Sequence, residues 1–213
     1  PYEVNEGECR KVWEKALEIY DKVTTLDDVF KANKQVNEMI DAIKTIEVPE
    51  EKKLRVGIVG EIYVVLEPSV NMDVENVLNK LGVETERSQY LSEWINFNAI
   101  PKPFKDKKVP KVLEKGTEFI EIQIGGHAKE TVGFIKDFKD RGFDGIVHLM
   151  PFGCLPELVT QSVAPSMSKI LDIPVLTIPI DEQTGKANNL TRLEAFVDLL
   201  KNKKAANSSK ASA

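Results

Sequence analysis

The chain has 213 residues, of which 42% are hydrophobic and 30% charged, so it can bury a core without metal or disulfide support and is not a fibrous or wholly disordered protein. The chain has 29 Lys and Arg residues and 34 Asp and Glu residues. This excess of negative charge does not provide the basic surface that nucleic-acid binding needs, so we expect no nucleic-acid partner. No apolar run approaches the roughly 20 residues that cross a bilayer, so we expect no membrane partner.

The chain opens on Pro1, with neither an initiator Met nor a signal segment, and we expect it to be a processed chain or a fragment. Its two cysteines, Cys9 and Cys154, stand in dissimilar settings far apart in the sequence. Secreted disulfide frameworks do not have this pattern, which favours a reducing, cytoplasmic location.

Residues 1–50 are predicted to form an N-terminal helical segment. Apolar residues recur there at helical spacing in two runs, and no strand-like alternation is present. Thr25 followed by Asp28 resembles a capping box, which would start the second helix. A charged connector at 49–53 then separates this segment from the rest of the chain.

Residues 54–202 alternate between short apolar runs and amphipathic stretches, the pattern of an open, doubly wound α/β sheet with crossover helices. Short helices and an irregular loop are expected at 90–116, where prolines interrupt any long helix. We expect about five parallel strands, at 54–59, 83–87, 119–124, 145–150 and 175–180.

Helix signals mark several of the intervening stretches. Gly82 would end the helix after the first strand. Pro156 suits the first turn of a later helix, which Pro165 must kink or divide. Thr191 with Glu194 resembles a capping box for the last helix, and the tail at 203–213, rich in Ala, Ser and Lys, is expected to be disordered.

Ligands of doubly wound sheets bind beyond the carboxyl ends of the strands, so the residues that follow the expected strands are the candidate site. An ordinary explanation competes with this one, because strand-to-helix loops collect Gly, Pro and polar residues to form turns. The sequence leaves both open. The residues concerned are Glu61, Ser88, Gly125, Gly126, His127, Gly153, Cys154 and Glu182.

Cys154 is the most specific candidate for a functional residue because it precedes a helix whose first turn is marked by Pro156. Helix N–H donors and the positive end of the helix dipole favour a thiolate there, which could bind metal or act as a nucleophile. The alternative is a small buried hydrophobe. Cys9, on an amphipathic helix, is interpreted as structural or incidental.

His127 follows two glycines that free backbone N–H groups for a ligand, and it could donate to an acyl carbonyl or act as an acid. It could equally be a helix cap. His148 lies within an apolar strand and is interpreted as a core histidine. Glu61 follows the first strand without a G-x-G-x-x-G loop, so a nicotinamide cofactor is not supported, and no phosphate loop or nucleophile elbow is present.

An ordered set of motifs over about residues 54–200 resembles the C-terminal part of proteins related to the 2-hydroxyacyl-CoA dehydratase subunits, a group also described as CoA protein activase or acyl-CoA dehydratase activase-related. The most specific segments are Gly-Gly-His at 125–127 and Met-Pro-Phe-Gly-Cys-Leu-Pro-Glu at 150–157. The others lie at 57–71, 87–94, 181–185 and 191–198.

This resemblance implies a flavodoxin-like fold and an oxygen-sensitive iron–sulfur protein of an anaerobe. In that superfamily two tandem flavodoxin-like domains hold the cluster between them. Dehydratase members remove water from a 2-hydroxyacyl-CoA through a ketyl radical, after a separate ATP-hydrolysing activator injects one electron. Double-cubane relatives reduce small molecules instead.

The resemblance implies roles for the strand-end residues. Cys154 would be a ligand of a [4Fe–4S] cluster, and acyl-CoA would be a ligand of the same edge. The catalytic candidates are Glu61, His127 and Glu182, and the cofactor-binding candidates are Gly125, Gly126 and Gly153.

The chain departs from that group in its cysteines. Ligation of a [4Fe–4S] cluster uses about four cysteines, and here only Cys154 stands at a cluster-like position. We therefore expect a Cys-rich N-terminal domain or a separate subunit to complete the site, and this chain alone to bind no cluster and be inactive. The competing hypothesis is a non-catalytic flavodoxin-like binding or assembly module without a cluster.

Overall fold

Two units make up the chain, Pro1–Lys53 and Leu54–Ala213, here called the helix-pair unit and the α/β unit. The computed structural model describes residues 1–101, 108–122 and 124–211. None of the helices in these ranges is both long and apolar enough to cross a membrane.

The helix-pair unit contains α1 (Glu8–Tyr20), α2 (Leu26–Asp41) and the short 3₁₀ helix η1 (Glu50–Lys52), which confirms the predicted helical segment. The predicted capping box is present at the start of α2. The Asp28 N–H donates to Thr25 Oγ1 at 3.2 Å, and the Thr25 N–H donates to Asp28 Oδ2 at 3.1 Å. Two of the unpaired N–H groups at the helix start are thereby satisfied.

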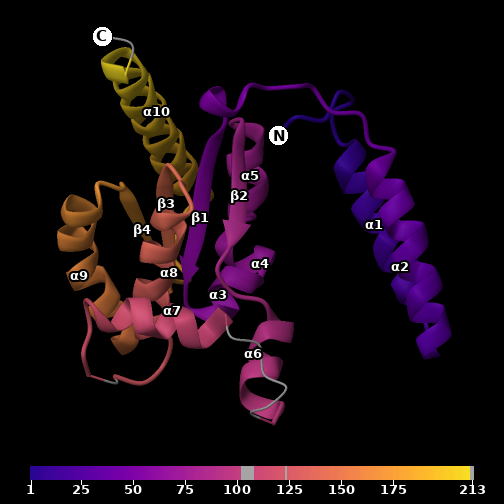
Figure 1. Cartoon of the computed structure of the whole chain (residues 1–213), viewed down its shortest axis with the longest axis horizontal. Coiled ribbons are helices and arrows are strands. Elements are labelled where there is room, and N and C mark those ends of the chain that lie inside the picture. Colours follow the sequence, from indigo (N-terminus) through magenta and orange to yellow (C-terminus); the bar gives the residue numbers. More distant parts are fainter. Residues whose placement is uncertain (102–107, 123, 212–213) are drawn as a thin grey trace. The chain divides into compact units, whose positions relative to one another are not determined.

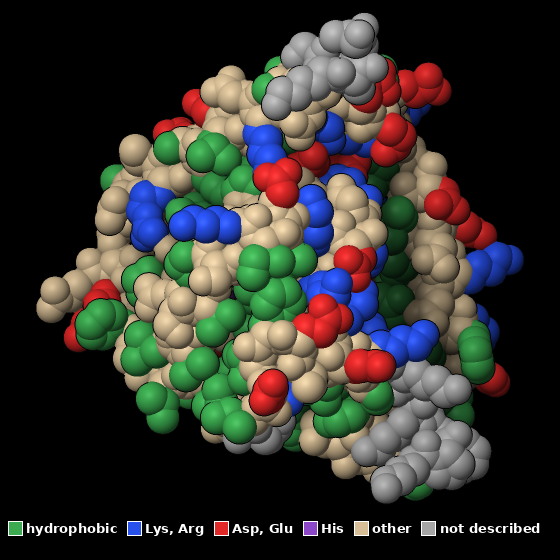
Figure 2. Space-filling model, turned by 60° about the vertical axis from the view of Figure 1, so that its left-hand side comes forward, with side chains coloured by type: hydrophobic (Ala, Val, Ile, Leu, Met, Phe, Trp, Pro, Cys, Tyr) green, Lys and Arg blue, Asp and Glu red, His purple; other side chains and the backbone are tan. Residues whose placement is uncertain are grey.

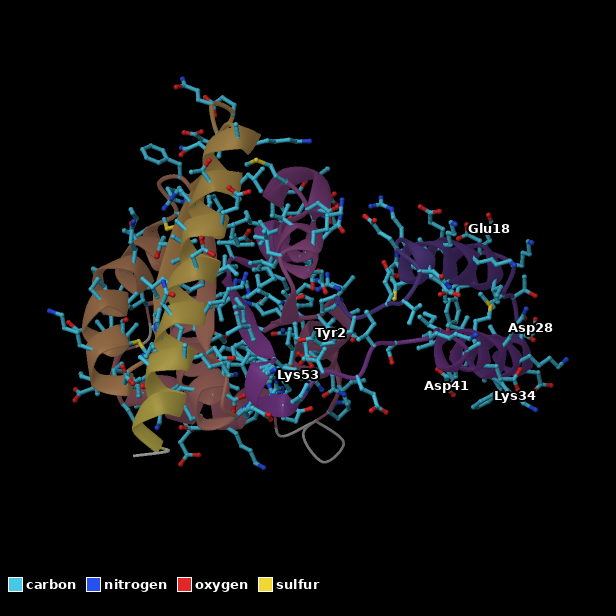
Figure 3. All side chains as sticks on the ribbon, turned by 90° about the horizontal axis from the view of Figure 1, so that it is seen from above. Tyr2, Glu18, Asp28, Lys34, Asp41 and Lys53 are labelled. Atoms are coloured by element: carbon cyan, nitrogen blue, oxygen red, sulfur yellow. The ribbon has the colours of Figure 1, made fainter. Side chains whose placement is uncertain are left out.

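Little apolar surface is buried within the helix pair. Its buried residues are the small side chains Ala16, Ala32 and Val36. Charged side chains project from both helices, as Figure 3 shows for Glu18 and Lys34.

The α/β unit is a four-stranded, all-parallel sheet in the order β2-β1-β3-β4, with helices packed on it, a flavodoxin-like arrangement (Figure 1). The predicted fold class is therefore confirmed. The strands are β1 (Leu54–Gly60), β2 (Val83–Arg87), β3 (Gly145–Pro151) and β4 (Val175–Ile180).

The strand predicted at 119–124 is wrong for the described part of that segment, which forms a loop after α7. Ile120 is buried and joins the core, while Phe119 and Ile124 pack against it. The apolar run therefore fills space between helices without pairing to the sheet. Residue 123 lies outside the described residues.

Helices cover both faces of the sheet because its central strands are apolar on both sides. Val56 and Ile58 belong to one core cluster and Val59 to the other, as the alternation of a strand requires. A Cβ at Gly57 would collide with the ring of Phe138, so the glycine lets α8 lie close to β1. The helices are α3 (Ile62–Leu66), α4 (Pro68–Asn71), α5 (Val74–Lys80), α6 (Leu91–Ala99), α7 (Lys108–Thr117), α8 (Ala128–Asp140), α9 (Leu155–Leu171) and α10 (Lys186–Ala211).

Two local predictions for α9 had different outcomes. Pro156 lies in the first turn of α9, as predicted. The helix is not divided at Pro165 and runs on to Leu171. Ala164 and Met167, both buried, hold the turns on either side of the proline in the core.

The last helix starts earlier and ends later than predicted. It begins at Lys186, so Thr191 lies inside it, and the Thr191 hydroxyl donates to the Ala187 carbonyl within the helix. Residues 203–211, expected to be disordered, continue α10. Ala and Lys are strong helix formers, and Lys203 and Lys204 form ion pairs with Asp172 and Asp144.

Candidate functional site

The carboxyl edge of the sheet gathers the loops that follow β1, β3 and β4. Glu61 follows β1, Cys154 follows β3 and Glu182 follows β4. His127 follows no strand, but the adjacent Gly126 packs on Pro156 in the first turn of α9, so it belongs to the same edge. These four residues therefore lie at one edge of one parallel sheet.

Glu61 is the N-cap of α3, and its carboxylate accepts a hydrogen bond from the Val64 N–H at 3.0 Å. That bond satisfies one of the free donors at the helix start. Its carboxylate is thus engaged in holding the turn after β1. Glu182, in contrast, is exposed in the loop between β4 and α10.

The two glycines before α8 have left-handed backbone, with φ of 86° at Gly125 and 56° at Gly126. At Gly126 a Cβ would also lie 2.6 Å from Pro156 Cγ, so a side chain there would push the loop away from α9. His127 is the N-cap residue of α8, and its side chain makes no capping hydrogen bond. The half-buried ring instead lines a pocket described below.

Cys154 is a free, half-buried thiol at the N-cap position of α9. Its side chain makes no capping hydrogen bond, and Gly153 before it has a left-handed φ of 78°. Phe152 and Leu155, on either side of this turn, are 75% and 70% exposed. In Figure 2 hydrophobic side chains gather over the lower part of the visible face, the end at which the strands finish in Figure 1.

Cys9, the other cysteine, belongs to the helix-pair unit and differs chemically. Partial burial raises the pKa of its thiol, and the neighbouring Glu3 carboxylate raises it further. That carboxylate accepts hydrogen bonds from the N–H groups of Gly7 and Cys9 at 2.6 and 2.7 Å. Cys9 is therefore a weak candidate for metal binding, which requires the thiolate.

A buried polar network lies under the turn that carries Cys154. His148 Nε2 and Glu157 Oε2 are 2.7 Å apart, and both residues are fully buried. His148 Nδ1 lies 3.2 Å from Thr177 Oγ1, and the Thr131 hydroxyl donates to Glu157 Oε1 at 3.2 Å. His148 is thus a hydrogen-bonded core histidine.

Glu157 was not identified from the sequence. An acidic residue in the first turn of a helix normally interacts with the helix dipole at the surface, so its burial has no local signal. Its place at the end of the Met-Pro-Phe-Gly-Cys-Leu-Pro-Glu segment, together with His148 in the preceding strand, is what could have singled it out.

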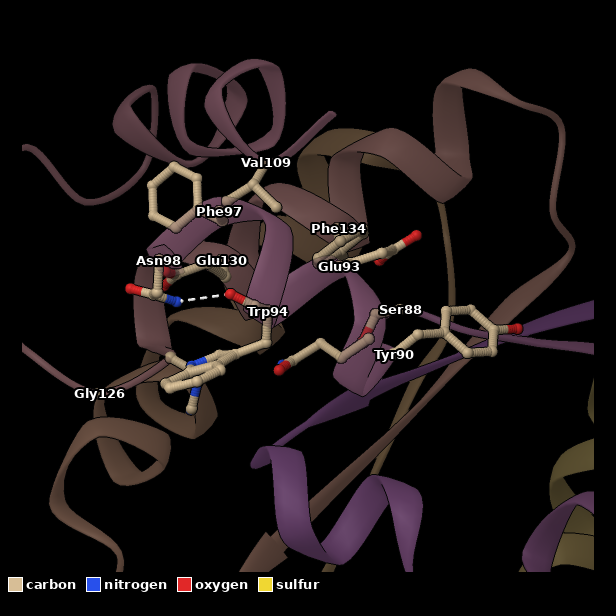
Figure 4. A pocket seen from close by; sticks show the side chains of 12 residues that line it. Ser88, Tyr90, Glu93, Trp94, Phe97, Asn98, Val109, Gly126, Glu130 and Phe134 are labelled. Atoms are coloured by element: carbon tan, nitrogen blue, oxygen red, sulfur yellow. Dashed lines mark hydrogen bonds between the residues drawn. The ribbon is translucent and has the colours of Figure 1, made fainter. Parts of the chain in front are cut away.

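A pocket of about 190 Å³ opens at the same edge (Figure 4). Its walls come from the loop after β2, from α6 and α7, and from the start of α8, and they combine aromatic side chains with a few polar ones. The lining residues are Ser88, Gln89, Tyr90, Glu93, Trp94, Phe97, Asn98, Val109, Gly126, His127, Glu130 and Phe134.

Two polar atoms of the pocket residues are shielded from solvent and have no hydrogen-bond partner within the described parts of the chain, Ser88 Oγ and Glu130 Oε2. Ser88 is fully buried. Gln89 next to it is satisfied, since its side-chain amide donates to the Gly60 carbonyl at 2.8 Å. Unpaired buried groups cost about 1–3 kcal/mol each.

The described lining carries two carboxyl groups, and the ammonium group of Lys108 lies close by, 5.7 Å from the centre of the Phe134 ring. Glu93 is neutralised by Lys108, whose Nζ lies 2.7 Å from Glu93 Oε1. No Lys or Arg is among the lining residues of the described structure. Glu130, in the first turn of α8, is the other carboxyl group among the described lining residues.

A complete iron–sulfur cluster does not fit the residues of this chain. Over the described ranges, no group of three or more His, Cys, Asp or Glu side chains could hold a metal ion. Cys154 is the one cysteine of the α/β unit. A [4Fe–4S] cluster uses about four thiolates, and the α/β unit can supply one of them at most.

Comparison of the chain with protein-family models, with curated proteins and with solved structures finds no match.

Proposed function

We propose that this chain is the C-terminal half of an iron–sulfur protein of the 2-hydroxyacyl-CoA dehydratase superfamily. It would contribute Cys154 as one cysteine ligand and its sheet edge as part of an acyl-CoA or small-molecule reduction site. The observation that carries the proposal is the setting of Cys154: a free thiol at a helix N-terminus, at the carboxyl edge of a flavodoxin-like sheet.

Two features around Cys154 support this role. The N-terminus of α9 stabilises negative charge, as a metal-binding thiolate requires. Phe152, Leu155 and Leu158 beside it are all exposed. An apolar surface around a thiol suits contact with a second protein surface, which would exclude water from a cluster held between the two.

The remaining cysteines would come from a Cys-rich domain or a separate subunit, because this chain supplies too few. An ATP-dependent activator and the cytoplasm of an anaerobe belong to the same proposal. By itself the chain is expected to show neither ATP hydrolysis nor dehydration of a 2-hydroxyacyl-CoA, since its sequence has neither a phosphate loop nor a full ligand set.

Anaerobic reconstitution with iron and sulfide tests the proposal. It should fail on this chain and succeed when the Cys-rich partner is present. In that complex Cys154→Ala should lose the visible absorption of the cluster, whereas the matched variant Cys9→Ala should keep it. A full iron content and an unchanged spectrum in Cys154→Ala would show that the thiol is not a ligand.

The alternative is a binding or assembly module without a cluster, and it is supported by polar side chains that already pair within the fold. Glu61 already caps α3, and His148 and Glu157 already satisfy each other inside the core. If this alternative holds, the partner complex should form without iron, and Cys154→Ala should leave its affinity unchanged.

The backbone at Gly125 and Gly126 suggests a place for a CoA phosphate, because both residues are exposed and precede the N-terminus of α8. Calorimetry with CoA at millimolar concentration would check this. An absence of heat would remove the anion site from the proposal while leaving the Cys154 assignment to the reconstitution experiment.

A further inference from the structure

The helix-pair unit carries an apolar surface that supports an inference independent of the iron–sulfur role. We infer that this surface binds the same surface of a second copy of the chain, so that two helix pairs form a four-helix bundle. The surface, here called the helix-pair face, is made of exposed large apolar side chains of both helices. They are Trp13, Leu17 and Tyr20 of α1 and Leu26, Phe30 and Ile40 of α2.

Each helix places these side chains on one stripe. Trp13, Leu17 and Tyr20 follow one another at intervals of four and three residues, as neighbours on one side of a helix do. In α2 the exposed positions 26, 30, 33, 37 and 40 continue the same alternation, and none of them holds a charged residue. Alternating intervals of four and three residues give the 3.5-residue repeat along which helices pack in bundles. The stripes therefore favour a helical partner.

The two stripes lie on the same side of the helix pair. The Tyr20 hydroxyl donates to Asn33 Oδ1 at 2.6 Å, which joins a stripe position of α1 to one of α2. Ala16, Ala32 and Val36 are the buried residues of the two helices. In both helices they lie about a quarter of a turn from the stripe, since successive residues are about 100° apart. The stripes thus border the seam between the helices and form one face that is two helices wide.

The area of the helix-pair face approaches that of a protein interface. Trp13, Phe30 and Tyr20 are 62%, 71% and 40% exposed. An aromatic side chain offers about 150–250 Å², so these three rings expose roughly 260–430 Å² on each copy. Two copies would bury roughly 500–850 Å² through the aromatic side chains alone. Leu17, Leu26 and Ile40 bring the total toward the roughly 1,200 Å² at which stable interfaces begin.

A second copy is the occupant that supplies what the unit lacks. The side chains that one helix pair buries are small, namely Ala16, Ala32 and Val36, and so short a unit needs more buried apolar surface to be stable. Two identical faces have equal length and width, so a two-fold axis covers both at once. A lipid surface is disfavoured because acidic residues outnumber basic ones in residues 1–53.

The rim of the helix-pair face carries charges of both signs. Arg10 and Glu14 form an ion pair on α1 at 3.4 Å, and Lys34 and Glu38 form one on α2 at 4.0 Å. Figure 3 shows Lys34 and Asp41 on the side of α2 that points away from α1. A rim of one sign would repel its own copy, whereas a mixed rim lets two identical faces approach.

Sedimentation equilibrium of the full chain tests the inference, and we expect a dimer at micromolar concentration. Leu17→Lys places a charge in the middle of the α1 stripe and keeps a strong helix former. It should raise the dissociation constant of the dimer more than about a hundredfold, because the two-fold axis buries two unpaired charges. Leu158→Lys on α9 is the matched control, since Leu158 is 41% exposed and Leu17 is 47% exposed. It should dimerise as the parent does.

Tryptophan fluorescence tests the same contact without altering the helix-pair face. The chain has two tryptophans, so the variant Trp94→Phe reports on Trp13 alone. Its emission should move to shorter wavelength as the protein concentration rises through the dissociation constant, because the dimer removes Trp13 from water. Adding Leu17→Lys to this variant should hold the emission at the longer wavelength over the same range of concentration.

Several results would overturn the inference. A monomer at every concentration up to the millimolar range would do so, and a short-wavelength Trp13 emission in that monomer would mean that another part of the same chain covers the face. A dimer that survives Leu17→Lys, or that both lysine variants dissociate equally, would have a different interface. None of these measurements involves iron or Cys154, so this inference and the proposed function fail separately.

Discussion

The two units of the chain are stabilised in different ways. The helix-pair unit buries Ala16, Ala32 and Val36 and leaves Phe30 71% exposed. The α/β unit builds two clusters of large apolar side chains, one on each face of its sheet. Since stabilisation by burial grows with apolar area, the α/β unit carries its own core, whereas the helix pair depends on helix caps and local hydrogen bonds.

The largest expected effect compares two phenylalanines, one in each unit. Phe138 is fully buried, and the centroid of its ring lies 4.6 Å from the centroid of the Phe143 ring. Phe138→Ala should lower the free energy of unfolding of the α/β unit by about 3–5 kcal/mol, through lost burial and a cavity. Phe30→Ala should change the stability of that unit by less than about 0.5 kcal/mol. Urea denaturation followed by circular dichroism measures both, and equal losses would contradict the comparison.

A smaller effect is expected from the polar part of the core. Glu157→Gln keeps the shape of the side chain but replaces one carboxyl oxygen, near His148 Nε2 or the Thr131 hydroxyl, by an NH₂ group that cannot accept a hydrogen bond. We expect a loss of roughly 1–3 kcal/mol, because His148 and the Thr131 hydroxyl remain buried with a weaker partner. Glu194→Gln, at an exposed position of α10, is the control and should change stability little. An equally stable Glu157→Gln would mean that the network does not support the core.

The spacing of apolar residues in the sequence was enough to predict most of the fold. Four strands and the helix pair follow from apolar spacing, because each presents a face that must be buried. The prediction of a strand at 119–124 was wrong because Ile120 packs into the core from a loop. A short apolar run in a buried loop has the same sequence pattern as a short buried strand. The prediction of disorder for residues 203–211 was wrong because a composition rich in Ala, Ser and Lys is compatible with disorder and with a helix. The ion pairs that Lys203 and Lys204 form with distant residues favour the helix.

The candidate site was predictable only in part, for a related reason. The rule that ligands bind at strand ends placed Ser88 and Cys154 at the carboxyl edge, whereas His127 was assigned to that edge through a strand at 119–124 that does not form in its described part. The pocket itself depends on α6, whose position no sequence period specifies, so its lining was not predicted. Glu157 was missed because burial of a helix-start carboxylate is a tertiary property that depends on His148.

The smallest effect concerns two Thr-x-x-acid motifs that look alike in sequence. Thr25 with Asp28 caps α2, whereas Thr191 with Glu194 lies inside α10. Thr25→Ala should therefore destabilise the start of α2 by about 1 kcal/mol, and Thr191→Ala should have almost no effect. Hydrogen exchange of the first-turn amides of each helix measures this difference. Equal protection changes in the two variants would contradict it.

The pH dependence of the same cap sharpens the comparison. Hydrogen bonds from the Thr25 side chain, and then from Thr24, lower the pKa of Asp28 below its ordinary value of 3.8. A group whose pKa is lowered by folding stabilises the folded state above its unfolded pKa and loses that contribution as the pH falls through the folded pKa. Protection at the start of α2 should thus decline in acid below about pH 4. In Thr25→Ala the pKa of Asp28 should rise toward its ordinary value, so the decline should become shallower. An NMR titration of the Asp28 carboxyl group in both proteins would measure the difference, and an unchanged pKa in the variant would show that Thr25 does not hold the carboxylate.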